Sequence, residues 1–510
     1  MSKLNSIRIQ NIRSLIDTSD IQLKPLTVLV GRNSVGKSTF ARIFPLLRQS
    51  SEANKKSPIL WYGKYVDFGD YETAINKENI DNGISLSFDL SIEPLELIGI
   101  FDFDYTITTN LSYAILRKLS NEKIDSKIDL FFKKNNDESY EYRIRILLLD
   151  YNISVIFNGN KVTISINNVI YDLNEDDIFN PTQKNILPNF EVNVENRKKP
   201  LSKKFDYFHY KNFLFLELLK NHTNIVHKNE NENEFYNQIL TKSAYNFIYK
   251  IDKKIKNDLP TPAFNINIED SAVYEHIFLI SKLPEIIDYY DKIISNYYKN
   301  VQYLEPLRAT AQRYYRKQEL AIDELDSKGS NIAMFLVEHD NNPTLKDLIR
   351  KHFGLKFITE SNKGHITLNL LSNKNEKTNL ADLGVGYSQL LPVILQLWNA
   401  VYSHKNDSDG CLVVEQPELH LHPAYQAKIA DITIDIINQL KNINRDYNFI
   451  YETHSPHLIN RLGELIEEGI LNHNDVQILI FDNENGKTNI IHSKFNDKGI
   501  LENWPFGFFN

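Results

Sequence analysis

Two glycines, a lysine and a serine lie close together near the N-terminus, in the spacing G-x-x-x-x-G-K-S from Gly31 to Ser38. Because Gly31 and Gly36 have no side chain, the backbone can close around a phosphate group. The backbone N–H groups of such a loop, and of a helix that follows it, point at an anion. In this pattern Lys37 reaches the β- and γ-phosphates of a nucleotide and the hydroxyl of Ser38 ligates Mg²⁺. We therefore predict ATP and Mg²⁺ as cofactors, and an ATP-binding loop made of Gly31, Arg32, Asn33, Ser34, Val35, Gly36, Lys37, Ser38 and Thr39.

The segments on either side of this loop are those that phosphate binding requires. Residues 26–30 are mostly apolar and β-branched, which predicts a buried strand before the loop. Apolar residues recur at helical spacing after the loop, at Phe40, Ile43, Phe44 and Leu47. The alternative is an ordinary turn between a strand and a helix that binds nothing. The order of strand, loop and helix favours nucleotide binding.

A second candidate for metal chemistry lies at the end of an apolar strand late in the chain. Residues 410–414 read Gly-Cys-Leu-Val-Val, and Glu415 follows them directly. This layout is typical of a Walker B strand, which lies beside the phosphate-binding strand and brings a carboxylate to the Mg²⁺ ion. We therefore predict Ser38 and Glu415 as the protein ligands of the metal. The alternative is a core strand followed by an acidic turn with a purely structural role.

Two further segments carry polar residues where ligands bind in α/β proteins. The start of an apolar helix contains Gly384, Gly386, Ser388 and Gln389. A helix N-terminus attracts anions, although a glycine turn before a helix is more often only a cap. His454 follows a short apolar strand, and in open α/β sheets ligands bind at the carboxyl ends of strands. A single histidine is usually structural, so the order of all the motifs along the chain decides how they are interpreted.

Taken together, these motifs resemble the SMC/RecF/OLD-like branch of the ABC-type, AAA-family ATPases. In that branch the phosphate-binding loop comes first, a glycine–serine helix start follows far downstream, and the acidic strand comes soon after it. Residues 6–14 look like the first strand of this branch, and residues 415–423 look like its Walker B region. The ending, residues 499–509, is similar to the tail of a prokaryotic subgroup without a Toprim domain. Members of that subgroup recur in anti-phage defence systems of the Septu-like and PARIS types.

The resemblance implies an α/β fold. We expect an ABC-type P-loop ATPase head, in which helices flank a mixed sheet, with a β/α insertion. Residues 1–95 and 301–510 would form the head, and residues 96–300 the insertion. In this class the glycine–serine helix start, called the signature, contacts the γ-phosphate held by another subunit. We therefore expect a homo-oligomer, at least a head-to-head dimer. The catalytic residues that the resemblance implies are Glu415, Gln416, Glu418 and His454.

The sequence departs from the ordinary ABC pattern at two positions. The residue after the Walker B acid is usually a second acid that polarises the attacking water, whereas here it is Gln416. An amide cannot accept a proton at neutral pH, so either Glu418 substitutes for the missing acid or hydrolysis is slow. The glutamine of the Q-loop is not identifiable. The nearest comparable stretch offers Asp67 instead.

The middle of the chain predicts strands followed by helices. Residues 84–92 alternate between apolar and polar side chains, which predicts a strand, and residues 141–172 predict a series of hairpins. From about residue 205 to 320 the apolar spacing becomes helical, most clearly over residues 277–298.

The composition is that of an ordinary soluble protein, with 42% hydrophobic and 24% charged residues. Its single cysteine excludes an internal disulfide and favours a cytoplasmic location. We find no signal peptide and no apolar run long enough to span a membrane. The net charge of −8 argues against a surface that is basic throughout, so nucleic-acid contact is a possibility only for local basic segments. These are residues 197–204 and a predicted helix with Arg308, Arg313, Arg316 and Lys317.

The sequence thus favours an ATP-binding and ATP-hydrolysing sensor or regulator of a prokaryotic anti-phage defence system. It would act through a partner effector encoded nearby, since we find no Toprim, H-N-H or zinc pattern that could cleave nucleic acid. One alternative is a RecF/SMC-like DNA repair or recombination ATPase that binds nucleic acid directly. A second alternative is a structural assembly protein that binds ATP and barely hydrolyses it, which is compatible with the amide at Gln416.

Overall fold

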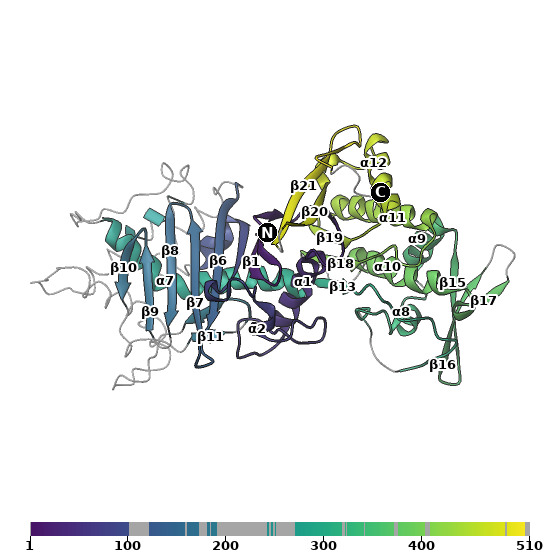
Figure 1. The fold of residues 1–510 in the computed structure, drawn as a ribbon, viewed down its shortest axis with the longest axis horizontal. Coiled ribbons are helices and arrows are strands. Elements are labelled where there is room, and N and C mark those ends of the chain that lie inside the picture. The colour runs from purple at the N-terminus through teal and green to yellow at the C-terminus, as the bar shows by residue number, and fades with distance from the viewer. Residues whose placement is uncertain are drawn as a thin grey trace, which may run out of the picture. The chain divides into compact units, whose positions relative to one another are not determined.

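The structure is a computed structural model of the chain. It describes residues 2–100, 122–158, 161–172, 181–183, 185–190, 242–243, 246–247, 250, 271–318, 322, 324–340, 342–371, 376–402, 409–484 and 487–504 (Figure 1). The basic segment 197–204 and the first part of the predicted helical region, residues 205–241, lie outside the described residues.

The chain forms two compact units, each built from separate stretches of sequence. The first unit comprises Met1–Ile9, Asn54–Pro58 and Asp81–Ile294, and the second comprises Gln10–Ala53, Ile59–Ile80 and Ser295–Asn510. The phosphate-binding loop, the strand that ends at Glu415, the glycine–serine helix start and His454 all belong to the second unit.

A seven-stranded sheet forms the centre of the second unit. Its strand order is β13-β18-β19-β4-β20-β21-β22. The first five of these strands are parallel, and β20, β21 and β22 pair antiparallel. The strands are β13 (Val301–Leu304), β18 (Gly410–Glu415), β19 (Tyr447–Glu452), β4 (Leu26–Gly31), β20 (Val476–Glu484), β21 (Lys487–Phe495) and β22 (Leu501–Glu502). Every residue of β4 and β18 is buried, which explains why both strands read as continuous apolar runs.

The position of the Walker B strand differs from the prediction. We expected the strand that ends at Glu415 to lie beside the phosphate-binding strand, but β19 lies between β18 and β4. The sequence could not show this order, because three buried parallel strands have similar apolar patterns and nothing in them marks which two are neighbours.

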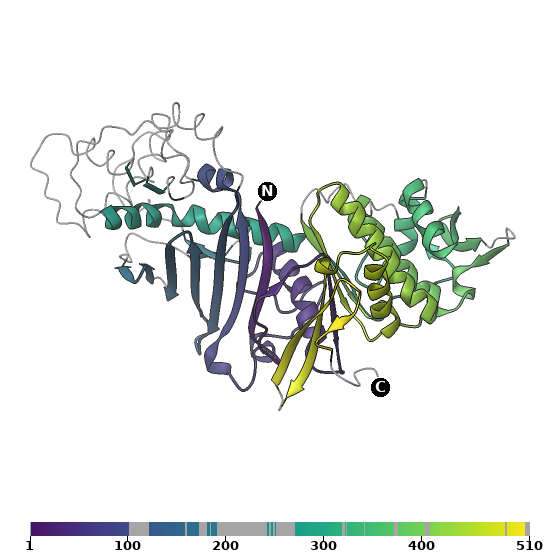
Figure 2. The ribbon, with the colours of Figure 1, turned by 90° about the horizontal axis from the view of Figure 1, so that it is seen from above.

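Helices pack around this sheet. Figure 2 shows the helices of the C-terminal half of the chain, coloured green, beside its strands. Helix α1 contacts β4, β13, β18 and β19, α10 contacts β13 and β18, and α11 packs against α12. These helices are α1 (Lys37–Glu52), α10 (Val385–Tyr402), α11 (Pro423–Asn442) and α12 (Pro456–Glu467). The predicted α/β class, a mixed sheet flanked by helices, is therefore confirmed.

The second unit also contains smaller elements. A four-stranded antiparallel sheet has the order β14-β16-β15, with β17 paired to β16. The elements are β2 (Leu15–Asp17), β3 (Ile21–Gln22), α2 (Tyr71–Ala74), β14 (Tyr315–Arg316), α8 (Ile332–Glu338), α9 (Pro343–Phe353), β15 (Lys356–Asn362), β16 (His365–Leu371) and β17 (Lys377–Asn379). The predicted helical spacing is thus wrong from β13 through β14. Because β13 is buried along its whole length, its side chains show no strand-like alternation.

The first unit is built on an antiparallel sheet whose strands follow one another as β10-β9-β8-β7-β6-β5-β1. Buried and partly exposed residues alternate along β8, as expected of a sheet with one face in the core. The predicted strand, hairpins and long helix are confirmed. The elements are β1 (Lys3–Ile12), β5 (Ile84–Ile92), α3 (Pro94–Ile100), β6 (Ile124–Lys134), β7 (Tyr140–Leu148), β8 (Tyr151–Asn158), β9 (Lys161–Ile166), β10 (Val169–Asp172), β11 (Pro181–Gln183), β12 (Pro188–Phe190) and α7 (Ser271–Lys299).

A charged cluster joins α9 to α11 and gives a testable contribution to stability. Asp435 Oδ2 lies 2.9 Å from His352 Nε2 and accepts a hydrogen bond of 2.7 Å from Lys351 Nζ. These two partners, His352 first, lower the pKa of Asp435 to about 2. A carboxyl group with a lowered pKa stabilises the fold above its unfolded pKa of about 4, and this contribution is lost as the pH falls through the folded value.

We expect Asp435→Asn to lower the free energy of unfolding at pH 7 by about 1 kcal/mol, since the cluster is only partly buried. The difference from wild type should shrink steadily as the pH falls from 4 to about 2. Urea unfolding at several pH values measures this difference. The exposed Asp347, which pairs with Arg350 on the same helix, provides the control Asp347→Asn, for which little change is expected.

Candidate functional site

The phosphate-binding loop joins the end of β4 to the start of α1. Gly31 has φ 149°, and a Cβ atom there would lie 2.3 Å from the carbonyl oxygen of Phe481, so only glycine fits. Gly36, which caps α1, has φ 105°, in the left-handed region that favours glycine. Lys37 is 3% exposed, and its Nζ donates hydrogen bonds to the carbonyl oxygens of Gly31 (2.9 Å) and Arg32 (2.6 Å). The loop thus holds a buried ammonium group among its own carbonyls.

Burial lowers the pKa of Lys37, while Glu452 and Glu418 act in the opposite direction. The Nζ atom lies 3.9 Å from Glu452 Oε1. An ammonium group has three donors and sits on a flexible stem, so it can exchange a carbonyl partner for a phosphate oxygen. The geometry therefore suits the predicted contact between Lys37 and nucleotide phosphates.

The serine of the loop pairs with a carboxylate to which the sequence analysis gave no role. Ser38 Oγ donates a hydrogen bond of 2.9 Å to Glu452 Oε1, at the end of β19. Glu452 is 4% exposed, and its other oxygen, Oε2, has no hydrogen-bond partner. Burial, and next the neighbouring Glu415, raise the pKa of Glu452. The available signal was a carboxylate at the carboxyl end of a strand, two residues before His454.

Glu415 lies at the end of β18 and is 2% exposed. Its Oε1 accepts hydrogen bonds from Arg42 Nε and from the hydroxyl of Tyr303, both 2.7 Å. Its Oε2 accepts a bond of 2.7 Å from Arg42 Nη2. The structure therefore pairs Glu415 with a bidentate guanidinium and pairs Ser38 with Glu452 instead. Arg42 follows Ser38 by four residues on α1, a helical spacing that could have drawn attention to it.

The turns after β18 and β19 are tied to each other. The Gln416 backbone, with φ 46°, donates its N–H to the carbonyl oxygen of Glu452 (2.7 Å). Glu418 accepts from the backbone N–H of His454 and from the hydroxyl of Thr453, both at 2.8 Å. Burial raises the pKa of Glu418. Both of its oxygens are thus engaged by the neighbouring turn.

The His454 side chain is exposed beside the loop. Burial of part of the ring, and next the charge of Lys37, lower the pKa of His454. The neutral ring is favoured at pH 7, and this form can accept or donate one hydrogen bond at the phosphate-binding loop. The structure therefore brings six predicted residues together at the carboxyl ends of the parallel strands. They are Lys37, Ser38, Glu415, Gln416, Glu418 and His454.

The predicted signature residues lie at the start of α10. Gly384 is exposed with φ 81°, and a Cβ atom on Gly386 would lie 3.2 Å from the carbonyl oxygen of His420. The buried Ser388 donates its hydroxyl to the carbonyl of Val385 (2.7 Å), within the same helix. The side chain of Gln389 is buried and bonds the backbone of Arg308 in the same chain.

Gln389 holds the backbone of Arg308 from both sides. Its Oε1 accepts the N–H of Arg308 (3.3 Å), and its Nε2 donates to the carbonyl of Arg308 (3.1 Å). The Arg308 side chain is 4% exposed, and its Nη2 donates a bond of 2.9 Å to the carbonyl of Glu415. Burial lowers the pKa of Arg308 to about 10. The predicted basic helix around Arg308 is wrong, because this segment is a loop that leads into the short strand β14.

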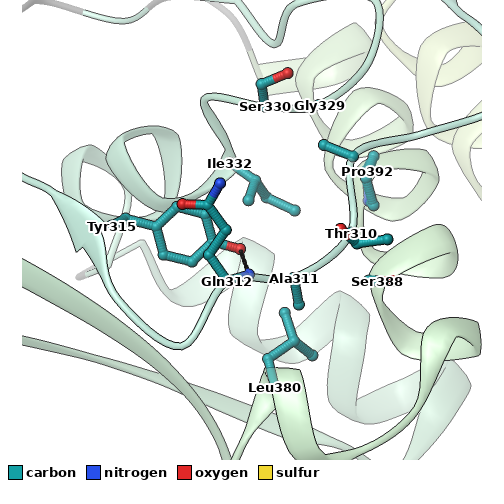
Figure 3. Close-up of a pocket in the computed structure, with 11 residues that line it drawn as sticks. Thr310, Ala311, Gln312, Tyr315, Gly329, Ser330, Ile332, Leu380, Ser388 and Pro392 are labelled. Atoms are coloured by element: carbon teal, nitrogen blue, oxygen red, sulfur yellow. Dashed lines mark hydrogen bonds between the residues drawn. The ribbon is translucent and has the colours of Figure 1, made fainter.

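A small cavity of about 120 Å³ lies beside the start of α10, between that helix and the loop after Arg308 (Figure 3). Ser388 and Pro392 of α10 line one side, and Gln312, whose N–H bonds the hydroxyl of Tyr315 at 3.0 Å, lines the other. Nucleotide-sized ligands occupy cavities of roughly 300–1,000 Å³, so this cavity is too small for one.

Comparison with known proteins identifies the family. Residues 2–459 match the profile of the family described as AAA ATPase domain. The chain belongs to this AAA ATPase domain family. A curated relative, the Septu protein PtuA of Bacillus thuringiensis, is 29% identical over 119 residues. That match covers 21% of this chain and only 28% of the relative. The predicted resemblance to AAA-family ATPases is therefore confirmed, and so is a similarity to a Septu protein over part of the chain.

Two solved structures show weaker likeness to this AAA ATPase chain. One is the Smc head domain of Pyrococcus furiosus bound to the C-terminal domain of ScpA, with 9% identity, a TM-score of 0.34 and coverage of 96% of both chains. The other is the SMC head domain from Thermotoga maritima, with 9% identity and a TM-score of 0.32. It is matched over 96% of this chain and 98% of its own.

Within the described part of this AAA ATPase domain, no group of three His, Cys, Asp or Glu side chains is placed to hold a metal ion. A Mg²⁺ ion that binds with a nucleotide needs only one or two protein ligands, because phosphate oxygens and water supply the others. None of the described helices is long and apolar enough to cross a lipid bilayer.

The ion pair between Arg42 and Glu415 gives a prediction for this AAA ATPase domain. Removal of Arg42 leaves a buried carboxylate without its counter-ion, which destabilises a fully buried pair by roughly 3–5 kcal/mol. Since Arg42 is 36% exposed, we expect a smaller loss for Arg42→Ala. It should be about 2 kcal/mol in the free energy of unfolding without nucleotide.

The double variant Arg42→Ala/Glu415→Gln should recover at least half of this loss, because the amide carries no charge that needs a partner. Urea unfolding of both proteins measures the effect. Arg350→Ala, which removes an exposed arginine from α9, is the control and should change stability by less than about 0.5 kcal/mol. A double variant that is less stable than Arg42→Ala would contradict this account of the pair.

Proposed function

We propose that the chain is the ATP-binding and ATP-hydrolysing sensor or regulator subunit of a prokaryotic anti-phage defence system, which acts through a partner effector. The observation that carries the proposal is the phosphate-binding loop with buried Lys37 at its centre. Two buried carboxylates, Glu415 and Glu452, lie at the ends of β18 and β19. Membership of the AAA ATPase domain family supports the nucleotide chemistry. The similarity to the Septu protein supports the defence role.

The proposed organisation follows the predicted one. Residues 1–95 and 301–510 contribute the ATPase head, and residues 96–300 are an insertion on which a partner protein docks. Two heads form at least a dimer in the cytoplasm, and the signature residues of one head, Gly384, Gly386, Ser388 and Gln389, face the nucleotide of the other. Closing of the heads on the γ-phosphate is then the step that changes the state of the partner.

The donor set of the site fits the proposed cofactors. The buried, unpartnered Oε2 atom of Glu452 beside the hydroxyl of Ser38 offers the oxygen ligands that Mg²⁺ prefers. Ser38 and one of the two buried carboxylates, Glu415 or Glu452, would hold the ion. When bound, Mg²⁺ would neutralise the charge on the phosphates. Lys37 would add a second positive charge, and the exposed imidazole of His454 would bond a phosphate oxygen.

The Lys37→Ala variant tests the nucleotide-binding part of the proposal. Without the ammonium group the phosphates lose a charge-assisted hydrogen bond, so ATP affinity should fall about tenfold or more. Titration of purified protein with a fluorescent ATP analogue measures the affinity. The exposed Lys346 on α9 gives the control Lys346→Ala, which should bind as wild type does. Equal affinity of Lys37→Ala and wild type would show that ATP does not bind in this loop.

The same two variants test the defence role. In cells that carry the gene with its neighbours, wild-type protein and Lys346→Ala should reduce the plating efficiency of sensitive phages. The Lys37→Ala variant should not, because the proposed regulator depends on its nucleotide state. Full protection by Lys37→Ala, or no protection by wild type against a broad phage panel, would contradict the proposed role.

Gln416 gives a prediction about turnover. An amide can orient water but cannot take its proton, so we expect slow hydrolysis by the wild-type chain. The variant Gln416→Glu should keep or raise the steady-state rate of ATP hydrolysis, since the side chain has nearly the same shape and adds a base. Gln416→Ala, which removes the polar group at the same backbone position, should lower the rate. A large loss in Gln416→Glu with an unchanged melting temperature would show that the amide itself is required.

A further inference from the structure

Two buried carboxylates lie side by side at the carboxyl ends of two parallel strands. Glu415 on β18 and Glu452 on β19 are register partners on neighbouring parallel strands, and both are less than 5% exposed. Two negative charges on neighbouring strands repel each other strongly when little water screens them. Each carboxylate therefore needs a positive partner, and the two differ in whether they have one.

The charge of Glu415 is already neutralised. Three hydrogen bonds of 2.7 Å reach its two oxygens, two from the Arg42 guanidinium and one from Tyr303. This is the bidentate arrangement that holds a carboxylate most firmly. To ligate a metal ion, Glu415 would have to give up at least one of these bonds inside the protein.

Glu452 has no such partner. Its Oε1 accepts the hydroxyl of Ser38, its Oε2 has no hydrogen-bond partner, and the nearest cation, Lys37 Nζ, lies 3.9 Å away. That ammonium group already bonds two loop carbonyls. A buried carboxylate oxygen without a partner is unfavourable, and a cation bound beside it would relieve this cost.

The spacing of the two oxygens also suits a divalent cation. Ser38 Oγ and Glu452 Oε1 lie 2.9 Å apart. Adjacent oxygen ligands of an octahedral Mg²⁺ ion, each about 2.0–2.1 Å from the metal, lie about 2.9 Å from each other. The hydroxyl and the carboxylate thus have the separation of two neighbouring ligands before any ion binds.

We propose that Glu452, together with Ser38, ligates the Mg²⁺ ion of bound Mg·ATP, and that Glu415 is a positioning residue that joins β18 to α1 through Arg42. This inference rests on the proposed function, because it concerns the metal that accompanies the nucleotide. It replaces the predicted ligand pair of Ser38 and Glu415. The metal-binding carboxylate then comes from the strand beside β4, not from the Walker B strand.

The test uses the full chain and two isosteric variants, Glu452→Gln and Glu415→Gln, with Mn²⁺ as the probe. Titration with a fluorescent ATP analogue in EDTA measures nucleotide binding without metal, and electron paramagnetic resonance measures free Mn²⁺ in the presence of ATP and protein. We expect Glu452→Gln to weaken Mn²⁺ binding by the ATP complex about tenfold or more, with ATP affinity in EDTA unchanged or improved. Glu415→Gln should weaken Mn²⁺ binding much less than Glu452→Gln does, because the oxygens of Glu415 are already engaged by Arg42 and Tyr303.

Further measurements separate the possible failures. Glu452→Asp keeps the carboxylate on a shorter stem and should bind Mn²⁺ with intermediate affinity, which also covers the case in which the amide variant does not fold. Melting temperatures of all variants check folding. This inference would be wrong if Glu415→Gln lost Mn²⁺ affinity and the Glu452 variants did not. It would also be wrong if Glu415→Gln and Glu452→Gln lost the same affinity. Neither outcome would contradict the proposed function. Failure of the wild-type chain to bind ATP in EDTA or with Mn²⁺ would overturn the proposed function, and this inference with it.

Discussion

The site depends on the compensation of charges that are held out of water at one edge of a parallel sheet. Lys37, Arg308, Glu415 and Glu452 are each less than 5% exposed, yet each carries a group that is strongly hydrated when free. The loop carbonyls hold Lys37, and the carbonyl of Glu415 holds Arg308. One carboxylate oxygen, Oε2 of Glu452, is left without a partner, and the proposed Mg²⁺ ion would supply the charge that it lacks.

The fold was predictable where a pattern has one physical cause. The alternation in β5 and β8 comes from a sheet with one buried face, and the helical spacing over residues 284–299 of α7 comes from a buried stripe. The prediction failed at β13, where every residue is buried and no alternation remains to be read. The order of β18, β19 and β4 could not be predicted either, because pairing between parallel strands is set by contacts distant in sequence.

The candidate site shows the same division. Gly31, Gly36 and Lys37 were predictable because a tight loop that donates N–H groups requires these residue types at fixed spacing. The partner of Ser38 was not, because either of two strand ends could bring a carboxylate to it. Choosing Glu415 assumed that β18 lies next to β4. In the structure the neighbour of β4 is β19, which is why Glu452 and not Glu415 reaches the serine. Tyr303 was missed because nothing in its local sequence indicates the carboxylate that it holds, and the local signal for Arg42 was only its helical spacing from Ser38.

Arg308 extends this argument from the metal site to the signature helix. Its backbone is clamped by Gln389 at the start of α10, and its guanidinium bonds the carbonyl at the end of β18. These bonds are buried, so a shift of α10 that breaks them leaves polar groups unsatisfied, and a shift that keeps them must move the loop as well. The helix start expected to face another subunit's nucleotide is thus joined by two residues to the strand that holds Glu415. In the proposed dimer, a second head that contacts this helix start would therefore act on the turn that carries Gln416 through Gln389 and Arg308.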